Sequence, residues 1–378
     1  MTVNFDLLTT NLREKRCNLI FTNNHEARNV KRWDSAYIYF ISGTGNARSA
    51  SHWMAEEAKY AGMEVVVQQI DRLENISFPG RSEKTLIGFA FPTHGFNAAP
   101  IMLKFIAGFP PRLCRDVFLL NTRAGMKISK LFTPGLSGLA LLLPAFILLL
   151  KGYSCRGFLP VDLPSNWIPL HPGLKKKVIE SIFVKWEARV REYAAKLYSG
   201  KNIYRGLWSI PVDILISPLA FGYYIAGRFF LSKTFIANSS CNGCGLCIKE
   251  CPTSSVIMVR NRPYWKITCE SCMRCLNRCP ERAIEAAHGM AVVFYLLIIT
   301  VNGLLASALS HLSAAGSGAS WYIFITRVTS VLLTVLIPSF IYLIIHYASG
   351  FRPLRTLLKF TSLTTFRFWR RYQPGSKK

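Results

Sequence analysis

Eight cysteines in two copies of one spacing constrain the fold of this chain more than any other feature. Each copy reads Cys-x-x-Cys-x-x-Cys-x-x-x-Cys-Pro, and both lie between residues 241 and 280 of the 378-residue chain. Three thiolates at i, i+3 and i+6 wrap one [4Fe-4S] cubane, and the fourth cysteine, stiffened by the proline, reaches across to the other cluster. The spacing therefore predicts two clusters, the first held by Cys241, Cys244, Cys247 and Cys279 and the second by Cys269, Cys272, Cys275 and Cys251.

Zinc is the alternative metal for repeated cysteine motifs. Repeats of four cysteines that end in Cys-Pro do not fit the usual zinc spacings, and no histidine lies within them. Iron–sulfur clusters are therefore favoured over zinc. Cys17, Cys114 and Cys155 are scattered, and we interpret them as ordinary buried thiols.

Upstream of the cysteines, short apolar runs alternate with helical stretches from residue 37 to about residue 200. This alternation is typical of βα units, which pack as a parallel sheet between helices. The runs expected to form strands are residues 37–41, 64–70, 86–91, 117–121 and 155–161. The last covering helix is expected over residues 174–198, before Gly200. The predicted fold class is α/β, with a doubly wound, five-stranded parallel sheet.

The loop after the first expected strand has the composition of a phosphate-binding site. It consists of Ser42, Gly43, Thr44, Gly45, Asn46 and Ala47. Hydroxyls and backbone N–H groups at a helix N-terminus bind a phosphate monoester, and a stretch that favours helix follows this loop directly. An ordinary glycine turn is the alternative, but the position after the first strand of an α/β pattern favours the phosphate site.

Two more loops follow the third and fourth expected strands, where a doubly wound sheet binds its ligand. They contain Pro92, Thr93, His94, Gly95 and Phe96 in one case and Asn121, Thr122, Arg123 and Gly125 in the other. Together with the phosphate loop, these residues resemble flavodoxin. The resemblance implies that residues 42–47 bind the phosphate of FMN. It also implies that His94 or Phe96, with residues 121–125, frames the isoalloxazine ring.

Residues 37–287 as a whole resemble the flavodoxin and two-cluster ferredoxin fusion family, which implies electron transfer with FMN and two [4Fe-4S] clusters as cofactors. The chain departs from flavodoxins at Ala47, where Thr or Ser is usual, and no ring-stacking Tyr or Trp is evident. The expected parts are an N-terminal extension (1–36), a flavodoxin-like FMN-binding domain (37–200), an apolar membrane-interfacial linker (201–239), a small α+β ferredoxin domain of the bacterial type (240–287), a transmembrane helical hairpin (288–350) and a basic cytoplasmic tail (351–378). On this division, the ferredoxin domain should keep its clusters without the residues after Ala287.

Apolar segments and basic charge together indicate a membrane protein with a basic cytoplasmic face. Lys and Arg outnumber Asp and Glu by 46 to 20, although 51% of the residues are hydrophobic. Residues 289–351 contain a single charge, Arg327, and are long enough for two spans, expected near residues 290–312 and 321–347. Eight basic residues and no acid follow in the tail. We therefore expect the protein in the cell (inner) membrane. The positive-inside rule favours an orientation with the redox domains and both termini in the cytoplasm.

Two other apolar stretches are expected to stay on the cytoplasmic side. A crossing by residues 131–150 would separate the last strand from its sheet, so we expect a sheet-covering helix there, kinked at Pro144 and with an apolar outer face. A crossing by residues 207–231 would separate the flavin from the clusters. Because Pro211 and Pro218 interrupt this stretch, a monotopic or re-entrant segment is expected.

The sequence favours a membrane-anchored electron carrier. The basic residues lie beside apolar spans, so nucleic acid is not an expected partner, and no GxGxxG fingerprint supports direct use of NAD(P)H. The expected partners are membrane lipid, a cytoplasmic electron donor and a membrane-associated acceptor. Two alternatives stay open: a reductase acting directly on a lipid, quinone or other apolar substrate, and an anchor or assembly subunit with a decayed flavin site. His288 and His346 could ligate a haem, although interfacial polar residues are the simpler interpretation.

Overall fold

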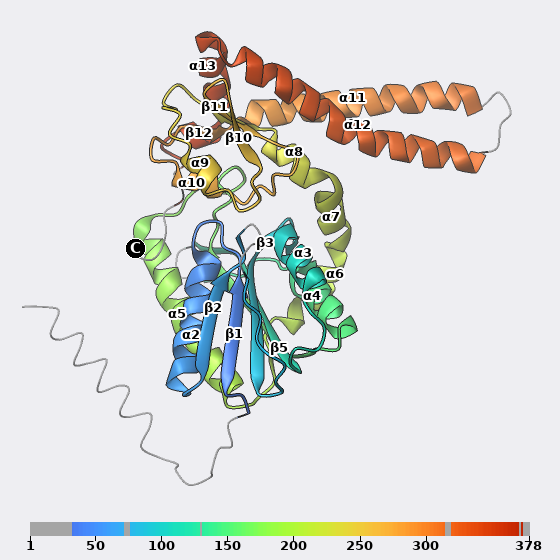
Figure 1. The fold of residues 1–378 in the computed structure, drawn as a ribbon. Coiled ribbons are helices and arrows are strands. Elements are labelled where there is room, and N and C mark those ends of the chain that lie inside the picture. Colours follow the sequence, from blue (N-terminus) through green and yellow to red (C-terminus); the bar gives the residue numbers. More distant parts are fainter. Residues whose placement is uncertain (1–31, 72–75, 129–130, 314–318, 370–371, 373–378) are drawn as a thin grey trace, which may run out of the picture.

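A parallel sheet is the centre of the computed structural model, which describes residues 32–71, 76–128, 131–313, 319–369 and 372. Its main strands lie in the order β2-β1-β3-β5-β7 (Figure 1). Numbered along the chain, this order is 2-1-3-4-5, that of flavodoxin-like folds. The strands are β1 (Ser35–Phe40), β2 (Glu64–Gln69), β3 (Thr85–His94), β5 (Asp116–Ile128) and β7 (Ser154–Pro164). The predicted α/β fold class is therefore confirmed.

Two pairs of helices cover the two faces of the sheet. The pairs are α2 (Asn46–Tyr60) with α5 (Lys176–Tyr198), and α3 (Pro100–Gly108) with α4 (Leu139–Leu150). Side chains alternate between the faces along each strand, so Ile38 packs into the core under α2 and α5 while its neighbour Tyr39 packs into the core under α3 and α4. These four helices do not cover the carboxyl ends of the strands, so the loops that follow the strands are available to form a site.

The sheet extends beyond the predicted strands. β5 runs on to Ile128 and pairs antiparallel with β6 (Leu131–Thr133), so the helix expected over residues 131–150 begins only at Leu139. Gly138, at the N-cap of that helix, has a φ of 55°, which glycine adopts without strain. Two short strands complete the sheet: β4 (Asn97–Ala98) beside β3 and β8 (Ile203–Tyr204) beside β7.

The apolar segment after β8 is a run of short helices. They are η2 (Leu207–Ser209), α6 (Ile210–Leu215), α7 (Ser217–Gly222), η3 (Tyr223–Gly227) and α8 (Arg228–Ser232). The two halves, Leu207–Leu215 and Ser217–Ile225, are bent by 64° next to Pro218, a geometry of a broken span or a re-entrant loop. Asp213 Oδ1 accepts a hydrogen bond of 2.6 Å from the Gly138 N–H, which fixes α6 to the start of α4.

The cysteine-rich region contains two small antiparallel sheets and two short helices. β9 (Phe235–Ala237) pairs with β12 (Ile284–Ala286), and β10 (Val256–Val259) pairs with β11 (Arg262–Trp265). The helices are α9 (Leu246–Lys249) and α10 (Arg274–Arg278). Within the linker expected over residues 201–239, β8 pairs with the large sheet and β9 pairs within the cysteine-rich region.

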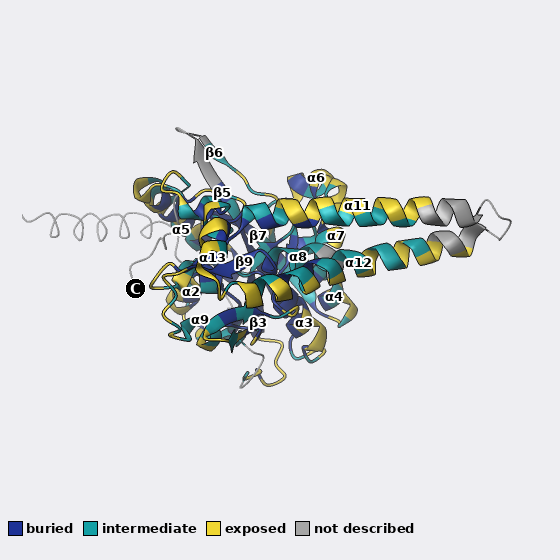
Figure 2. Ribbon diagram, turned by 90° about the horizontal axis from the view of Figure 1, so that it is seen from above, coloured by how far each residue is buried: buried dark blue, intermediate teal, exposed yellow. Residues whose placement is uncertain are grey.

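Two long apolar helices, α11 (His288–Ser313) and α12 (Ala319–Ala348), project as a hairpin from the cysteine-rich region (Figures 1 and 2). The stretches His288–Ser307 and Phe324–Ala348 are long and apolar enough to cross a membrane, and only 11% and 12% of their most apolar windows are buried. α13 (Arg352–Phe360) and η4 (Leu363–Thr365) follow the hairpin. The predicted helical hairpin is therefore present near the C-terminus.

The hairpin and the cysteine-rich region share one apolar core. Met290 and Phe294 of α11, Tyr342 of α12 and Leu358 of α13 are buried in the same cluster as Trp265 of β11. The Trp265 N–H also donates a hydrogen bond of 3.4 Å to the Tyr342 hydroxyl. The bases of the long helices are therefore part of the fold that holds the cysteines.

Candidate cofactor sites

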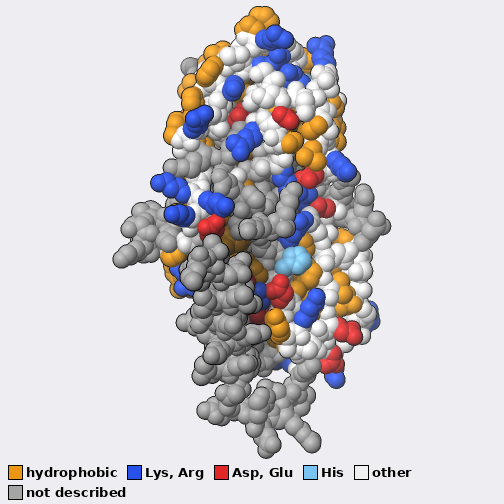
Figure 3. Space-filling model, turned by 90° about the vertical axis from the view of Figure 1, so that its left-hand side faces the viewer, with side chains coloured by type: hydrophobic (Ala, Val, Ile, Leu, Met, Phe, Trp, Pro, Cys, Tyr) orange, Lys and Arg blue, Asp and Glu red, His pale blue; other side chains and the backbone are white. Residues whose placement is uncertain are grey.

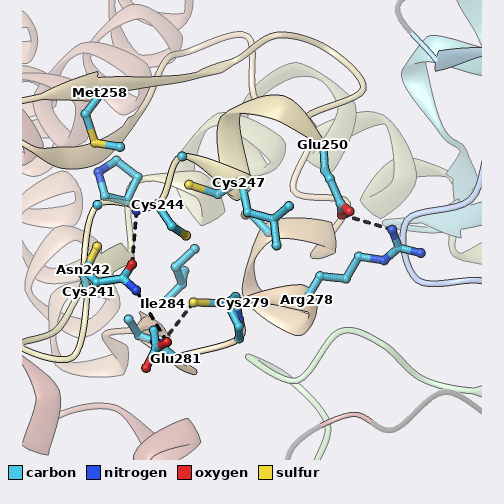
Figure 4. Close-up of a pocket in the computed structure, with 17 residues that line it drawn as sticks. Cys241, Asn242, Cys244, Cys247, Glu250, Met258, Arg278, Cys279, Glu281 and Ile284 are labelled. Carbon is cyan, nitrogen blue, oxygen red and sulfur yellow. Dashed lines mark hydrogen bonds and ion pairs between the residues drawn. The ribbon is translucent and has the colours of Figure 1, made fainter.

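Three cysteines of the first repeat lie together with the last cysteine of the second repeat. Cys241, Cys244 and Cys247 come from the loop before α9 and from α9 itself, and Cys279 follows α10. Their side chains surround one small space (Figure 4). Gly245 has a φ of 73°, a left-handed conformation that glycine adopts readily and that turns the loop around this space.

The other four cysteines form a second group. It consists of Cys269, Cys272, Cys275 and Cys251, which interact electrostatically with one another. Two N–H groups point at sulfur atoms of this group: the Ser255 amide lies 3.2 Å from Cys251 Sγ, and Trp265 Nε1 lies 3.4 Å from Cys275 Sγ. Hydrogen bonds of this kind stabilise negative charge on sulfur and tune the potential of an iron–sulfur cluster.

Both groups suit a [4Fe-4S] cluster, which takes one thiolate at each of its four iron atoms. In each group the fourth cysteine comes from the other repeat. Burial raises the pKa of the Cys247 and Cys272 thiols to about 11, and bound iron would hold them as thiolates. Among the described residues, no three His, Cys, Asp or Glu side chains converge as a single metal ion would require.

The two groups differ in their access to solvent. Cys244 of the first group is exposed, whereas Cys251 and Cys269 of the second group are buried. A cluster in the first group would therefore lie close to the protein surface, and a cluster in the second group would lie inside the molecule.

A buried lysine lies beside the second group. Lys233 is 1% exposed, and its Nζ donates a hydrogen bond of 2.6 Å to the Trp265 carbonyl and lies 4.8 Å from the centre of the Tyr342 ring. Burial lowers the pKa of Lys233 to about 8, partly opposed by the nearby Cys269, which leaves the amine mostly protonated at pH 7. A cation here favours the reduced, more negative state of a cluster.

Replacing Lys233 with methionine should lower the reduction potential of the cluster in the second group by roughly 50–100 mV, as expected for one charge acting through a protein dielectric of about 20. EPR-monitored redox titration of the full-length protein measures this shift. Lys249→Met, which removes an exposed lysine of α9, is the control and should leave that potential in place. Equal potentials in both variants and in the unmodified protein would contradict this role of Lys233.

The loop between β1 and α2 has the geometry of a phosphate site. The N–H of Gly45, whose φ is 114°, donates a hydrogen bond of 3.0 Å to Ser42 Oγ. The Thr44 hydroxyl is buried, and its one neighbour among the described polar groups is the Tyr372 hydroxyl, which itself donates to Asn46 Oδ1 at 2.9 Å. Buried hydroxyls are normally well paired, and a phosphate oxygen at the N-terminus of α2 would pair this one. The loop therefore fits a phosphate group.

A cavity of about 660 Å³ lies next to this loop, a size typical of cofactor sites. The predicted flavin residues that line it are Ser42, Gly43, Thr44, Asn46, Ala47, Pro92, Thr93, Gly95, Phe96, Thr122 and Arg123. Gly45, His94, Asn121 and Gly125 are not among the lining residues. His94 is buried with its ring 5.7 Å from that of Trp167, and burial lowers its pKa to about 4. The Asn121 amide donates a hydrogen bond of 2.8 Å to Oγ1 of the lining residue Thr93 and so holds that side chain in place.

Sequence reasoning missed an aromatic wall of this cavity. Trp167, in the loop after β7, and Tyr223, in η3, both line the cavity, and their ring centres are 5.6 Å apart. A Cβ atom at Gly95 would lie 2.0 Å from the Tyr223 ring, so glycine permits this close packing. Trp167 follows the fifth main strand, and the same rule that located the other two loops would have found it. No pattern around Tyr223 marks it as part of a site.

Arg274, which lies between two cysteines of the second group, joins that group to the phosphate loop. Its guanidinium forms an ion pair of 2.7 Å with Asp71 and donates hydrogen bonds to the carbonyl oxygens of Ser42 (2.7 Å) and Gly43 (3.3 Å). A Cβ atom at Gly43 would lie 2.3 Å from the Cys272 carbonyl oxygen. The backbones of the phosphate loop and the second cysteine group are therefore in direct contact.

His288 is fully engaged within the protein. The Leu363 N–H donates to its Nδ1 at 3.0 Å, and its Nε2 lies 2.7 Å from the Pro169 carbonyl oxygen, to which it donates. Both ring nitrogens are used, so the structure gives no support to haem ligation by His288. His346 lies against Tyr264, with ring centres 5.0 Å apart.

Comparisons with known proteins found one family match and several similar solved structures. Residues 240–284 match the 4Fe-4S dicluster domain family. No curated protein sequence matches the chain. Similar solved structures include rubredoxin oxygen oxidoreductase from Desulfovibrio gigas (16% identity, TM-score 0.29, 45% of this chain and 37% of that one). They also include an azoreductase from Bacillus anthracis (12%, 0.29, 43% and 99%) and an archaeal flavodoxin (13%, 0.26, 42% and 98%).

The strand order of the sheet and the matched cysteine region lead to one description of the chain. The order 2-1-3-4-5 is that of flavodoxin-like folds, and the match over residues 240–284 identifies an iron–sulfur region. Iron–sulfur clusters carry electrons. The chain therefore joins a flavodoxin-like fold to a region that matches the 4Fe-4S dicluster domain family, which supports a role in electron transfer.

Proposed function

We propose that the protein is a membrane-anchored electron carrier that holds FMN and two [4Fe-4S] clusters in series. The observation that carries the proposal is the contact between the phosphate loop and the second cysteine group, made by Arg274 and Gly43. With both cofactors bound, this contact leaves FMN and the second cluster as neighbours. The clusters pass single electrons and the flavin takes one or two, while the protein supplies binding, orientation and electrostatics.

The order of the cofactors follows from burial and from the contact with the phosphate loop. The first cluster, on Cys241, Cys244, Cys247 and Cys279, lies near the surface. The second, on Cys269, Cys272, Cys275 and Cys251, is the one whose backbone contacts the phosphate loop, so it is the neighbour of FMN. A soluble donor would therefore transfer electrons to the first cluster. Basic side chains are frequent on the upper half of the face in Figure 3, and Lys249, Arg278 and Arg282 are exposed near the first group. A donor with an acidic docking surface suits this face.

The FMN proposal predicts that Thr44→Ala weakens FMN binding by about tenfold, because the variant loses a hydrogen bond of ~1.5 kcal/mol to a charged phosphate. Thr44→Ser, which keeps the hydroxyl, should bind FMN like the unmodified protein. Fluorescence titration of the deflavinated protein measures both. Equal affinities of the alanine and serine variants would contradict the phosphate site. Protein that never binds flavin would favour an anchor or assembly subunit.

Membrane anchoring is supported by the hairpin and by apolar surface at its base. Leu149 and Leu150 of α4, Leu215 of α6 and Phe221 of α7 are between 63% and 78% exposed. These helices lie on the side of the molecule toward which the hairpin projects (Figures 1 and 2). An exposed apolar face beside two apolar helices suits the membrane interface, with the hairpin inserted in the bilayer.

The proposed orientation predicts the outcome of cysteine labelling in intact cells. Ser317→Cys, between the two long helices, should react with a membrane-impermeant reagent added outside. Thr356→Cys, on the exposed side of α13, should react only after the cells are opened, because the basic residues around it hold this end in the cytoplasm. The scattered cysteines 17, 114 and 155 are replaced in both variants. External labelling of Thr356→Cys would reverse the orientation.

A further inference from the structure

We propose that the flavin cavity also receives a membrane-soluble quinone, which enters from the bilayer side and is reduced there. This inference rests on the proposed function and names the class of its acceptor. The observation behind it is that two parts of the molecule form the walls of the cavity. Some lining residues belong to the flavodoxin-like domain, and others belong to the elements proposed to meet the membrane.

The membrane-side half of the cavity is apolar. The apolar lining residues on this side are Leu219 of α7, Tyr223 and Gly227 of η3, Phe230 and Leu231 of α8, and Ala286 and Ala291. Thr234 and His288 also line it, and none of the residues on this side is Asp, Glu, Lys or Arg. Because α11 continues directly from this wall into the first apolar span, the cavity lies at the level where the hairpin would enter the bilayer.

The aromatic side chains of the cavity point to the class of this molecule. Trp167 and Tyr223 both line the cavity, with their ring centres 5.6 Å apart. The buried Tyr223 hydroxyl lies on the side of Cys269 and Cys272. A flat ring packs well against aromatic side chains, and a quinone is a flat, lipid-soluble ring that accepts electrons, whereas an acyl chain is neither flat nor redox-active.

The redox step balances with components that the proposal names. A quinone takes up two electrons and two protons and becomes a quinol, with two new O–H bonds and no bond broken to another group. The electrons come one at a time from a low-potential soluble donor through the clusters and the flavin, and the protons come from water. Dithionite replaces the donor in vitro.

Photoaffinity labelling tests the site in full-length, cofactor-loaded protein in lipid nanodiscs. A short-chain azidoquinone should cross-link to residues 217–232 and 288–291, and excess unlabelled quinone should suppress the labelling. Ala291→Trp fills the membrane-side half and should reduce labelling by about tenfold, since the indole takes up the volume that the quinone ring needs. Val292→Trp is the matched control, because Val292 is 57% exposed and does not line the cavity.

The outcomes separate this inference from the function on which it rests. Labelling that is spread along both long helices, resists competition, or is equal in the two tryptophan variants would overturn the quinone site. FMN and iron are measured in the same nanodiscs: if both are present without specific labelling, only the quinone inference fails, whereas their absence contradicts the electron carrier itself. Leu219→Trp serves as a second variant should Ala291→Trp not fold, and competition in the unmodified protein tests the site without any variant.

Discussion

Arg274→Met should slow the reduction of FMN through the clusters by roughly ten- to a hundredfold, the scale on which displacements of about 1 Å change reaction rates. Arg274 is buried and binds Asp71 together with the carbonyl oxygens of Ser42, Gly43 and Glu250. Its removal takes the donor away from these carbonyl oxygens, and an unpaired buried acceptor costs about 1–3 kcal/mol. Asp71, whose side chain is 33% exposed, keeps its hydrogen bond from Gln69. The second cysteine group should then lose its fixed position against the phosphate loop.

Stopped-flow absorbance of the anaerobic protein with dithionite follows the clusters and the flavin separately. Arg278→Met is the matched control, since this arginine lies four residues away in the same helix and pairs with Glu250 at the surface, with its side chain 39% exposed. Such pairs are worth about 0–1 kcal/mol, so the control should keep its rate. Flavin reduction at the normal rate in Arg274→Met would show that the junction does not connect the two cofactors.

Truncation after Ala287 should abolish binding of the second cluster. The truncated chain lacks Met290, Phe294, Tyr342 and Leu358, which are buried in the core beneath the second cysteine group. Burial of four such side chains contributes about 6–12 kcal/mol, which is comparable with the whole stability of a domain. Iron and sulfide analysis of the truncated protein should therefore give little or no cluster in this group.

A pair of point variants separates loss of packing from loss of membrane insertion. Tyr342→Ala removes a buried ring from α12 and should lower cluster content, whereas Leu332→Ala, on the same helix but 54% exposed, should not. A truncated protein with a full complement of iron would contradict the shared core. It would restore the expectation from sequence that the cysteine-rich region folds without the hairpin.

Local sequence patterns were sufficient for the main fold. Alternating strands and helices predicted the parallel sheet, because burial between two helical layers makes each strand apolar along its length. They failed where the chain departs from that alternation. Leu131 and Phe132 are apolar, yet residues 131–133 pair with the extended end of β5 instead of joining the helix that begins at Leu139. Hydrophobicity alone does not distinguish such a short strand from the first turn of a helix.

The candidate sites likewise contain parts that local sequence patterns predict and parts that they do not. The cysteine spacing located both groups, since each repeat is short and its geometry is local. The junction was not predictable: Arg274 looks like any basic residue of the repeat, and its partners Ser42 and Asp71 lie about 200 residues earlier in the chain. Tyr223 joins the cavity only because the bent apolar segment returns to Gly95, a contact set by tertiary packing.

The central claim, that one chain holds FMN beside two clusters, is tested most directly by composition. Full-length protein purified anaerobically in mild detergent should contain one FMN, about eight iron and about eight acid-labile sulfide per chain, as two cubanes require. On partial reduction, the second cluster should broaden the EPR signal of the flavin radical. In Cys272→Ser, which lacks a proposed ligand of that cluster, the signal should have the unbroadened line shape of an isolated flavin radical. Stoichiometric zinc without iron, or clusters with no flavin under any loading condition, would contradict the account.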